Sequence, residues 1–284
     1  MAYLLLDTNA VYDLIRRKNS TELMLKLAKA HNFQLAIAPM ILVECITRAF
    51  EKEDFWRTIT KPAFKKLKSL QPVILADQDK LLESMAYGDL DLVNHDENWD
   101  KILNHFYECE REGADFVYKV GKKAKRYIHA QFIKNSRNTW EERYIKDWLY
   151  MLKSNGVPNA DILTDIDYQT QTKAINPGFL QSNKWENTFF EAIEERTQMS
   201  LNDKKQDILD MNKYVKQEFQ TIWEKVINSG YKPFSKNKKN DYNDMSVMEY
   251  AGLNDVYVFS GDTKMADKTT AVQDGKLFIR SCDD

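Results

Sequence analysis

The chain has 284 residues, of which 43% are hydrophobic and 30% are charged, and its formal net charge is −2. This length suits one or two domains with a substantial core, and the charge balance excludes a globally basic nucleic-acid coat but not a local basic patch. The 3 cysteines, Cys45, Cys109 and Cys282, lie far apart, so we expect no disulfide framework and a cytoplasmic location. No run approaches the roughly 18–20 apolar residues that span a membrane, and Asp7 interrupts the first apolar run too early for a signal peptide.

Strand and helix patterns alternate at both ends of the chain. The stretch YLLL at 3–6 is apolar on both faces, which is typical of a strand buried in a parallel sheet. We expect Thr8 or Asn9 to be the N-cap of the helix that follows, and Gly252 to lie near the end of a later helix. The predicted strands are residues 3–6, 33–38, 72–76, 255–262 and 276–280, and the predicted helices are residues 8–19, 39–50, 77–86 and 244–253. This alternation indicates an α/β fold with a central parallel sheet between two layers of helices.

The middle of the chain has a different pattern. From about residue 89 to about residue 238 there is almost no strand signal, and residues 207–230 repeat apolar side chains at helical spacing. The apolar positions of that segment are Ile208, Met211, Val215, Phe219, Ile222 and Val226. We therefore predict a mainly helical insertion at 89–238 that divides an α/β domain into residues 1–88 and 239–284.

Four carboxylates follow or adjoin the predicted strands. Asp7 and Asp262 end strands, Asp244 begins the helix before one of them, and Glu44 lies in the helix after the second strand. Ligands of an open parallel sheet bind at the carboxyl ends of its strands, so these acids are expected to converge. Carboxylates that converge either protonate or hold a cation, and an oxygen-only site suits Mg²⁺ or Mn²⁺. Such sites serve phosphodiester hydrolysis by activating water and stabilising charge on the phosphate.

The segments YLLLDTNAVYDLI, APMILVECI, NDYNDMSVMEYAGLNDVYVFSGD and KLFIR together resemble the PIN-domain nuclease family, which includes toxin-type ribonucleases. The resemblance covers roughly residues 1–87 and 240–284. It implies a three-layer α/β/α domain and a metal-dependent ribonuclease that leaves 5′-phosphate and 3′-hydroxyl ends. The residues to which it assigns catalysis and metal binding are Asp7, Glu44, Asp244 and Asp262.

The resemblance also suggests supporting residues around these four acids. Asn9 and Ser260 match polar positions of the family that orient the ligands or water. Asp241 lies three residues before Asp244 and is expected to do the same, although it could fill the third acidic position itself. We favour Asp244 for that position, because its spacing to Asp262 fits one helix, a turn and one strand.

Three other interpretations remain open. In the first, each acid has only a structural role, since an Asp at a strand end often caps the next helix. The stretch VFSGDTKMAD resembles the motif of HAD-type phosphatases, with Asp262 and Asp267 as Mg²⁺ ligands, but that family needs a second Asp where this chain has Asn9. In the third interpretation, the fold is a catalytically weak scaffold that binds nucleic acid or protein.

Basic residues outside the acidic set are candidates for binding phosphate. A run of cations without acids at 119–137 and the stretch NKKN at 237–240 could bring nucleic acid to the site, or could simply be solvated surface. The candidate residues are Lys122, Lys123, Lys125, Arg126, Lys238 and Lys239. RNA rather than DNA is the expected partner, no membrane is expected, and a protein partner bound through the insertion and a homodimer are left open.

Overall fold

The computed structural model describes residues 1–42, 44, 45, 53–108, 190, 191, 194, 195, 198, 200–229 and 240–279. Its core is a five-stranded sheet with the strand order β3-β2-β1-β4-β5, in which every pairing is parallel. The strands are β1 (Ala2–Leu6), β2 (Phe33–Ile37), β3 (Val73–Ile74), β4 (Val256–Ser260) and β5 (Leu277–Ile279). The predicted α/β class, central parallel sheet and strand positions are confirmed.

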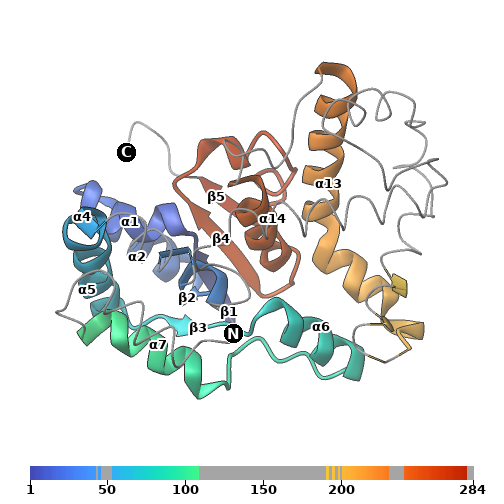
Figure 1. Ribbon diagram of the computed structural model, residues 1–284, viewed down its shortest axis with the longest axis horizontal. Coiled ribbons are helices and arrows are strands. Elements are labelled where there is room, and N and C mark those ends of the chain that lie inside the picture. Colours follow the sequence, from blue (N-terminus) through green and yellow to red (C-terminus); the bar gives the residue numbers. More distant parts are fainter. Residues whose placement is uncertain are drawn as a thin grey trace.

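Helices surround this sheet (Figure 1). In the described part of the chain they are α1 (Thr8–Arg16), α2 (Ser20–His31), α4 (Glu53–Phe55), α5 (Lys61–Leu70), α6 (Gln78–Tyr87), α7 (Glu97–Glu108), α13 (Lys205–Ser229) and α14 (Asn240–Ala251), with short turns η1 (Trp56–Thr60), η4 (Asn202–Lys204) and η5 (Thr263–Met265). Helices α1, α2 and α5 lie on one side of the strands, and α13 and α14 lie on the other. This arrangement is compatible with three layers, and α2 and α5 go beyond the predicted elements. None of the described helices is both long and apolar enough to cross a bilayer.

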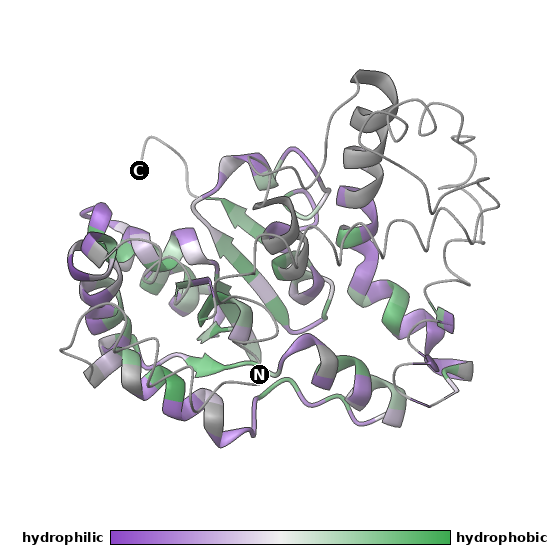
Figure 2. Ribbon diagram, in the orientation of Figure 1, coloured by the Kyte–Doolittle hydropathy of each residue, from purple (hydrophilic) through white to green (hydrophobic). Residues whose placement is uncertain are grey.

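The central position of β1 follows from its sequence. Leu4, Leu5 and Leu6 are each 0% exposed, so consecutive side chains are buried on both faces of the sheet. A strand without a polar face is stable only where helices or other elements cover both faces. Figure 2 accordingly shows the strands in hydrophobic green, while the helices around them carry both hydrophobic and hydrophilic residues.

Both described ends of the predicted insertion pack onto the α/β domain. Phe106 of α7 stacks on Phe64 of α5, with ring centroids 4.1 Å apart. The backbone after α6 pairs with the end of β3 through an antiparallel bridge between Leu75 and Val93. Helix α13 packs along α14. Residues 109–189 lie outside the described part, so the separate helical subdomain stays a prediction.

The buried face of α13 includes residues beyond the predicted apolar positions. Ile208 and Met211 are buried as expected, but the stripe continues through Tyr214 and Glu218, which are 0% and 1% exposed. Val215 is half-buried and packs against the core, and the side chains of the later predicted positions lie outside the described part. The docking of α13 therefore also buries a carboxylate, Glu218, which the predicted apolar positions did not include.

Candidate acidic site at the carboxyl ends of the strands

Asp7 joins β1 to α1. Its backbone is extended (φ −71°, ψ 173°), and its Oδ1 accepts a hydrogen bond from the Ala10 amide at 2.6 Å. Asp7 is therefore the N-cap of α1, and the prediction of Thr8 or Asn9 as the cap was wrong. The reason is local: Thr8 already begins the helix, so the last extended residue supplies the capping oxygen.

Ser260 lies beside Asp7 because β1 and β4 are parallel neighbours. Leu6 is paired with Phe259, so the next residue of each strand reaches the same edge of the sheet. The Ser260 hydroxyl donates a hydrogen bond to Oδ2 of Asp7, and its oxygen accepts one from the Asp262 amide at 2.9 Å. Asp7 and Ser260 are 5% and 0% exposed. The strand register thus fixes one oxygen of the Asp7 carboxylate, and the Ala10 amide fixes the other.

Glu44 reaches the same place from the segment after β2. Residues 39–42 and 44–45 are helical, and the Glu44 side chain is buried. The Thr8 hydroxyl donates a hydrogen bond to Oε2 of Glu44. Because Thr8 directly follows Asp7, this bond holds the Glu44 carboxylate next to the start of α1.

Asp244 lies in the second turn of α14, because that helix begins at Asn240 rather than at Asp244 as expected. Its Oδ2 lies 2.9 Å from Nζ of Lys268. The same ammonium lies 2.8 Å from Oε1 of Glu218 on α13. Burial opposes the charged form of Lys268, but the two carboxylates outweigh burial and raise its pKa well above its usual range.

The electrostatics of Asp7 show that the acids act on one another. Burial raises the pKa of Asp7 to about 7, although the bonds from Ser260 and Ala10 oppose that rise. The charges of Glu44 and Asp244 raise the same pKa further. Two residues from segments distant in the sequence, Glu44 and Asp244, therefore place negative charge near one buried carboxylate.

Asp262 lies at the end of β4 but is only half-buried. It caps η5 by accepting a hydrogen bond from the Lys264 amide at 2.9 Å. The turn before it is tight, because a Cβ on Gly261 would lie 2.8 Å from Oδ2 of Asp13 and 3.4 Å from Cβ of Asn9. Asn9 therefore packs against this turn, close to Asp262.

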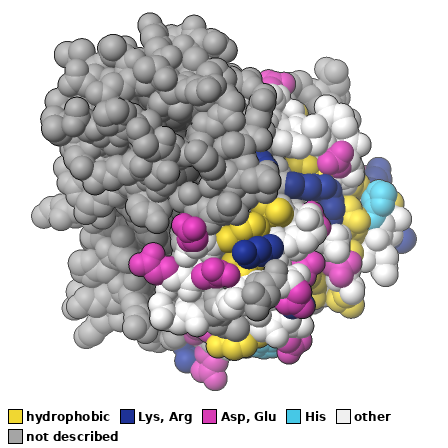
Figure 3. All heavy atoms as spheres, turned by 90° about the vertical axis from the view of Figure 1, so that its right-hand side faces the viewer, with side chains coloured by type: hydrophobic (Ala, Val, Ile, Leu, Met, Phe, Trp, Pro, Cys, Tyr) yellow, Lys and Arg dark blue, Asp and Glu magenta, His cyan; other side chains and the backbone are white. Residues whose placement is uncertain are grey.

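Some predicted residues cannot be placed. Asp241 lies in α14, but its side chain is outside the described part. The candidate phosphate-binding residues Lys122, Lys123, Lys125, Arg126, Lys238 and Lys239 are also outside it. On the described part of the face shown in Figure 3, acidic, basic and hydrophobic side chains are mixed, without a broad basic surface.

The donor set at this edge is made of oxygens. Carboxylates, a serine hydroxyl and a threonine hydroxyl are hard ligands, which fit Mg²⁺ or Mn²⁺ better than zinc. Among the described residues, no three His, Cys, Asp or Glu side chains are grouped as ligands of one ion. A cation bound here would relieve the repulsion that Glu44 and Asp244 exert on Asp7. To ligate the cation, the carboxylates would have to move closer together.

Sequence reasoning missed the charged residues Lys268, Glu218 and Asp13 at this site. Glu218 lies two helical turns after Met211, so helical spacing could have placed it on the buried face of α13, but a carboxylate is not expected there. Asp13 is buried one turn and a half after Asp7 and touches the turn at Gly261. Lys268 had no local signal, because its partners lie on two other elements.

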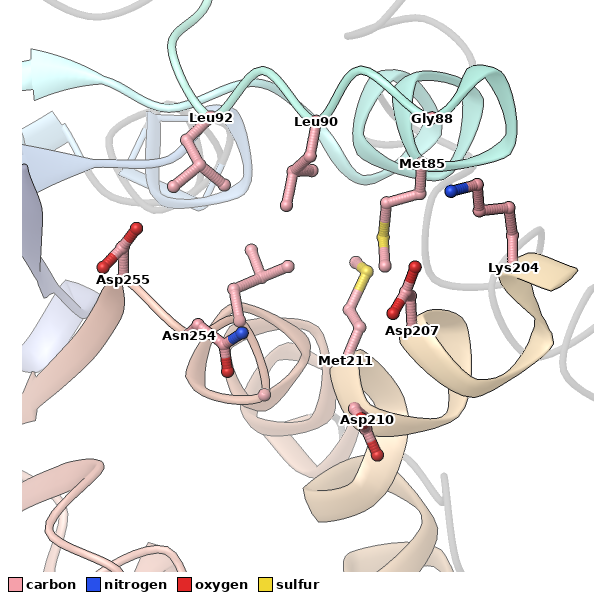
Figure 4. Close-up of a pocket in the computed structure, with 12 residues that line it drawn as sticks. Met85, Gly88, Leu90, Leu92, Lys204, Asp207, Asp210, Met211, Asn254 and Asp255 are labelled. Carbon is pink, nitrogen blue, oxygen red and sulfur yellow. The ribbon is translucent and has the colours of Figure 1, made fainter.

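A pocket of about 290 Å³ lies where the segment after α6 approaches α13 and the start of β4 (Figure 4). Leu90 and Leu92 point into it from the segment after α6, and Met211 faces them from α13. Asn254 and Asp255, which precede β4, complete its wall. The lining joins the amino end of β4 to the segment whose Leu92 carbonyl accepts a hydrogen bond from the Ala76 amide, just after β3. Asp7, Glu44, Asp244 and Asp262 do not line this pocket, so it is separate from the acidic site.

The structure thus defines an α/β protein with an acidic, oxygen-lined site at the carboxyl edge of a parallel sheet. Comparison with known proteins finds no family model, no curated protein and no solved structure that matches this chain.

Ser260→Ala is expected to raise the pKa of Asp7 further, because the hydroxyl bond lowers it. A hydrogen bond to a charged group is worth about 1.5–3 kcal/mol, so the shift should be about one pH unit or more. Urea denaturation in chelator between pH 5 and pH 10 would show it, because stability would go on falling to a higher pH than in the wild type. Ser84→Ala, which removes a hydroxyl bonded within α6, is the control. An unchanged pH profile for Ser260→Ala would contradict the expected role of the hydroxyl.

Proposed function

We propose that the protein is a divalent-metal-dependent phosphodiester hydrolase, with RNA as the expected substrate. The observation that carries the proposal is the placement of Glu44 and Asp244 near the buried Asp7 carboxylate, at the carboxyl edge of the sheet, where their charges raise the pKa of Asp7. A buried carboxylate with a pKa near 7 is costly at neutral pH unless a cation or a reaction uses its charge.

The residues of the site have distinct roles in this proposal. Asp7, Glu44 and Asp244 would hold Mg²⁺ or Mn²⁺, and Asp262 would contribute from the edge of the site. When bound, the ion supplies a water of lowered pKa and positive charge for the phosphate oxygens. Ser260 fixes the orientation of Asp7 through a hydrogen bond. Thr8 does the same for Glu44, so both carboxylates are oriented before the ion arrives.

A PIN-like architecture is part of the proposal. It is supported by the all-parallel sheet, by acids at the carboxyl ends of β1 and β4, and by a helix that carries Asp244 directly before β4. The preference for RNA rests on the sequence resemblance alone. Three further proposals also rest on the sequence alone. They are a cytoplasmic location, a protein partner bound through the insertion, and a homodimer.

Cleavage assays test the proposal directly. Labelled single-stranded RNA, double-stranded RNA and DNA are incubated with the protein in Mn²⁺ or in chelator, and we expect cleavage of RNA only with the metal. Glu44→Gln keeps an acceptor for Thr8 but removes charge, so it should lower the rate about a hundredfold or more. Full activity of Glu44→Gln, or activity in chelator, would contradict the assignment.

Asp267→Asn is the matched control and separates the two enzyme interpretations. Asp267 is exposed beyond η5, so the nuclease proposal predicts unchanged RNA cleavage. The phosphatase interpretation uses Asp267 as a metal ligand and predicts a loss of phosphomonoester hydrolysis in this variant. A catalytically weak scaffold predicts no Mn²⁺-linked rise in melting temperature.

A further inference from the structure

Lys268 is held between two carboxylates next to the proposed metal ligands. Its Nζ lies 2.9 Å from Oδ2 of Asp244 and 2.8 Å from Oε1 of Glu218. The side chains of Lys268, Asp244 and Glu218 are 11%, 16% and 1% exposed. One ammonium is therefore shared between α14 and α13 in surroundings from which water is largely excluded.

The backbone near Lys268 is anchored independently of its charge. The Thr221 hydroxyl lies 3.3 Å from the carbonyl oxygen of Lys268, within hydrogen-bonding distance. The Thr270 amide donates to Oε1 of Gln217 at 2.8 Å. Both Thr221 and Gln217 belong to α13, so the loop stays on that helix if the ammonium changes its partner.

The position of the ammonium matters for any cation that binds here. Asp244 adds to the negative charge around Asp7, and it is also the carboxylate that Lys268 contacts. A divalent ion at Asp244 would meet a positive charge already there, and two cations at one carboxylate repel each other. Glu218 on α13 gives the ammonium a second partner, which is almost fully buried.

On the basis of the proposed function, we infer that Lys268 and the divalent ion compete for the Asp244 carboxylate, and that Glu218 holds the ammonium aside when the ion binds. Helix α13 carries Glu218 and the anchors of the Lys268 loop. The position of α13 therefore sets the metal affinity of the site, which links the segment predicted as an insertion to catalysis.

Calorimetric titration of Mn²⁺ into the chelator-treated full chain tests the competition. In Glu218→Gln the ammonium loses one carboxylate partner and keeps Asp244, so Mn²⁺ should bind about tenfold more weakly than in the wild type. In the double variant Glu218→Gln with Lys268→Met the competitor is gone, and Mn²⁺ should bind about tenfold more tightly than in the wild type. Each tenfold change corresponds to about 1.4 kcal/mol.

The double variant is used because Lys268→Met alone would leave the Glu218 charge buried without its ammonium, which destabilises the fold. The control is the double variant Glu218→Gln with Lys264→Met. Lys264 is an exposed lysine of the same loop region, so this control should bind Mn²⁺ as Glu218→Gln does. Equal or weaker binding by the double variant, relative to Glu218→Gln, overturns the competition and leaves the proposed function standing. No Mn²⁺ binding by any of these proteins overturns both.

Discussion

Asp7→Asn is expected to abolish the proposed cleavage and at the same time to stabilise the protein at pH 8. The substitution keeps the capping oxygen for the Ala10 amide, since Asn and Asp are equally good N-caps. It removes the negative charge that Glu44 and Asp244 repel. The loss of one ligand charge should lower the cleavage rate by about a hundredfold or more.

The stability effect has a defined pH window. In the folded protein the pKa of Asp7 is raised from 3.8 to about 7, so the folded state binds the proton more tightly than the unfolded state does. Wild-type stability should therefore fall as the pH rises from about 4 to about 7, by about 4 kcal/mol. The Asn variant does not titrate, so its advantage should be absent near pH 4 and nearly complete at pH 8. The Ser260 hydroxyl loses a charged acceptor, so the net stabilisation of the Asn variant at pH 8 should be about 1–3 kcal/mol.

Urea denaturation in chelator at pH 4, 6 and 8 measures this gain, and repeating it in Mn²⁺ separates the two effects. Mn²⁺ should stabilise the wild type at pH 8 but not Asp7→Asn, because only the wild type binds the ion. Asp77→Asn is the matched control, since Asp77 caps α6 through the Lys80 amide at 2.9 Å. It should change neither cleavage nor the pH profile. Metal-dependent cleavage retained by Asp7→Asn would refute the assignment of Asp7.

The predictable part of the site depends on local patterns. The run YLLL has no polar face, so it had to be a central strand, and the residue after it had to lie at the carboxyl edge. The same reasoning placed Asp262 after β4. The cap of α1 was wrong because the sequence does not say whether Asp7 or the residue after it is the last extended one. The structure shows that Asp7 caps the helix and also lies among the acids, so its capping and functional interpretations are compatible.

The unpredictable part depends on how distant elements dock. Lys268 meets Glu218 and Asp244 only because α13 packs along α14, and no local pattern specifies that packing. The periodicity of α13 allowed two adjacent faces after Met211, one through Val215 and one through Tyr214 and Glu218. An amphipathic pattern favours the valine face, whereas burial of the Glu218 carboxylate becomes acceptable once the Lys268 ammonium is present.

Gly252→Ala is expected to destabilise the fold by at least about 3 kcal/mol, because there is no room for a side chain at this position. Gly252 directly follows α14, as predicted for a helix end. A Cβ there would lie 1.9 Å from the carbonyl oxygen of Met211 and 2.4 Å from its carbonyl carbon. Both atoms are backbone of α13, so relief requires the whole helix to move away from α14 rather than a side chain to rotate.

Gly275→Ala is the matched control for the same change. Gly275 has a φ of +67°, but a Cβ there would meet nothing within 4 Å. It should cost only about 1 kcal/mol of backbone strain, and both variants are compared by urea denaturation. Equal stabilities of the two variants would mean that α13 does not approach α14 as closely as described.

The Gly252 contact also links packing to the site. Met211 and Glu218 lie two turns apart on the same buried face of α13, so displacing the helix at Met211 should draw Glu218 away from Lys268. In a Gly252→Ala protein that still folds, adding Glu218→Gln should therefore change Mn²⁺ affinity less than it does in the wild type. Such a loss of additivity is the mark of residues that act through one shared contact. An unchanged effect of Glu218→Gln would separate the docking of α13 from the acidic site.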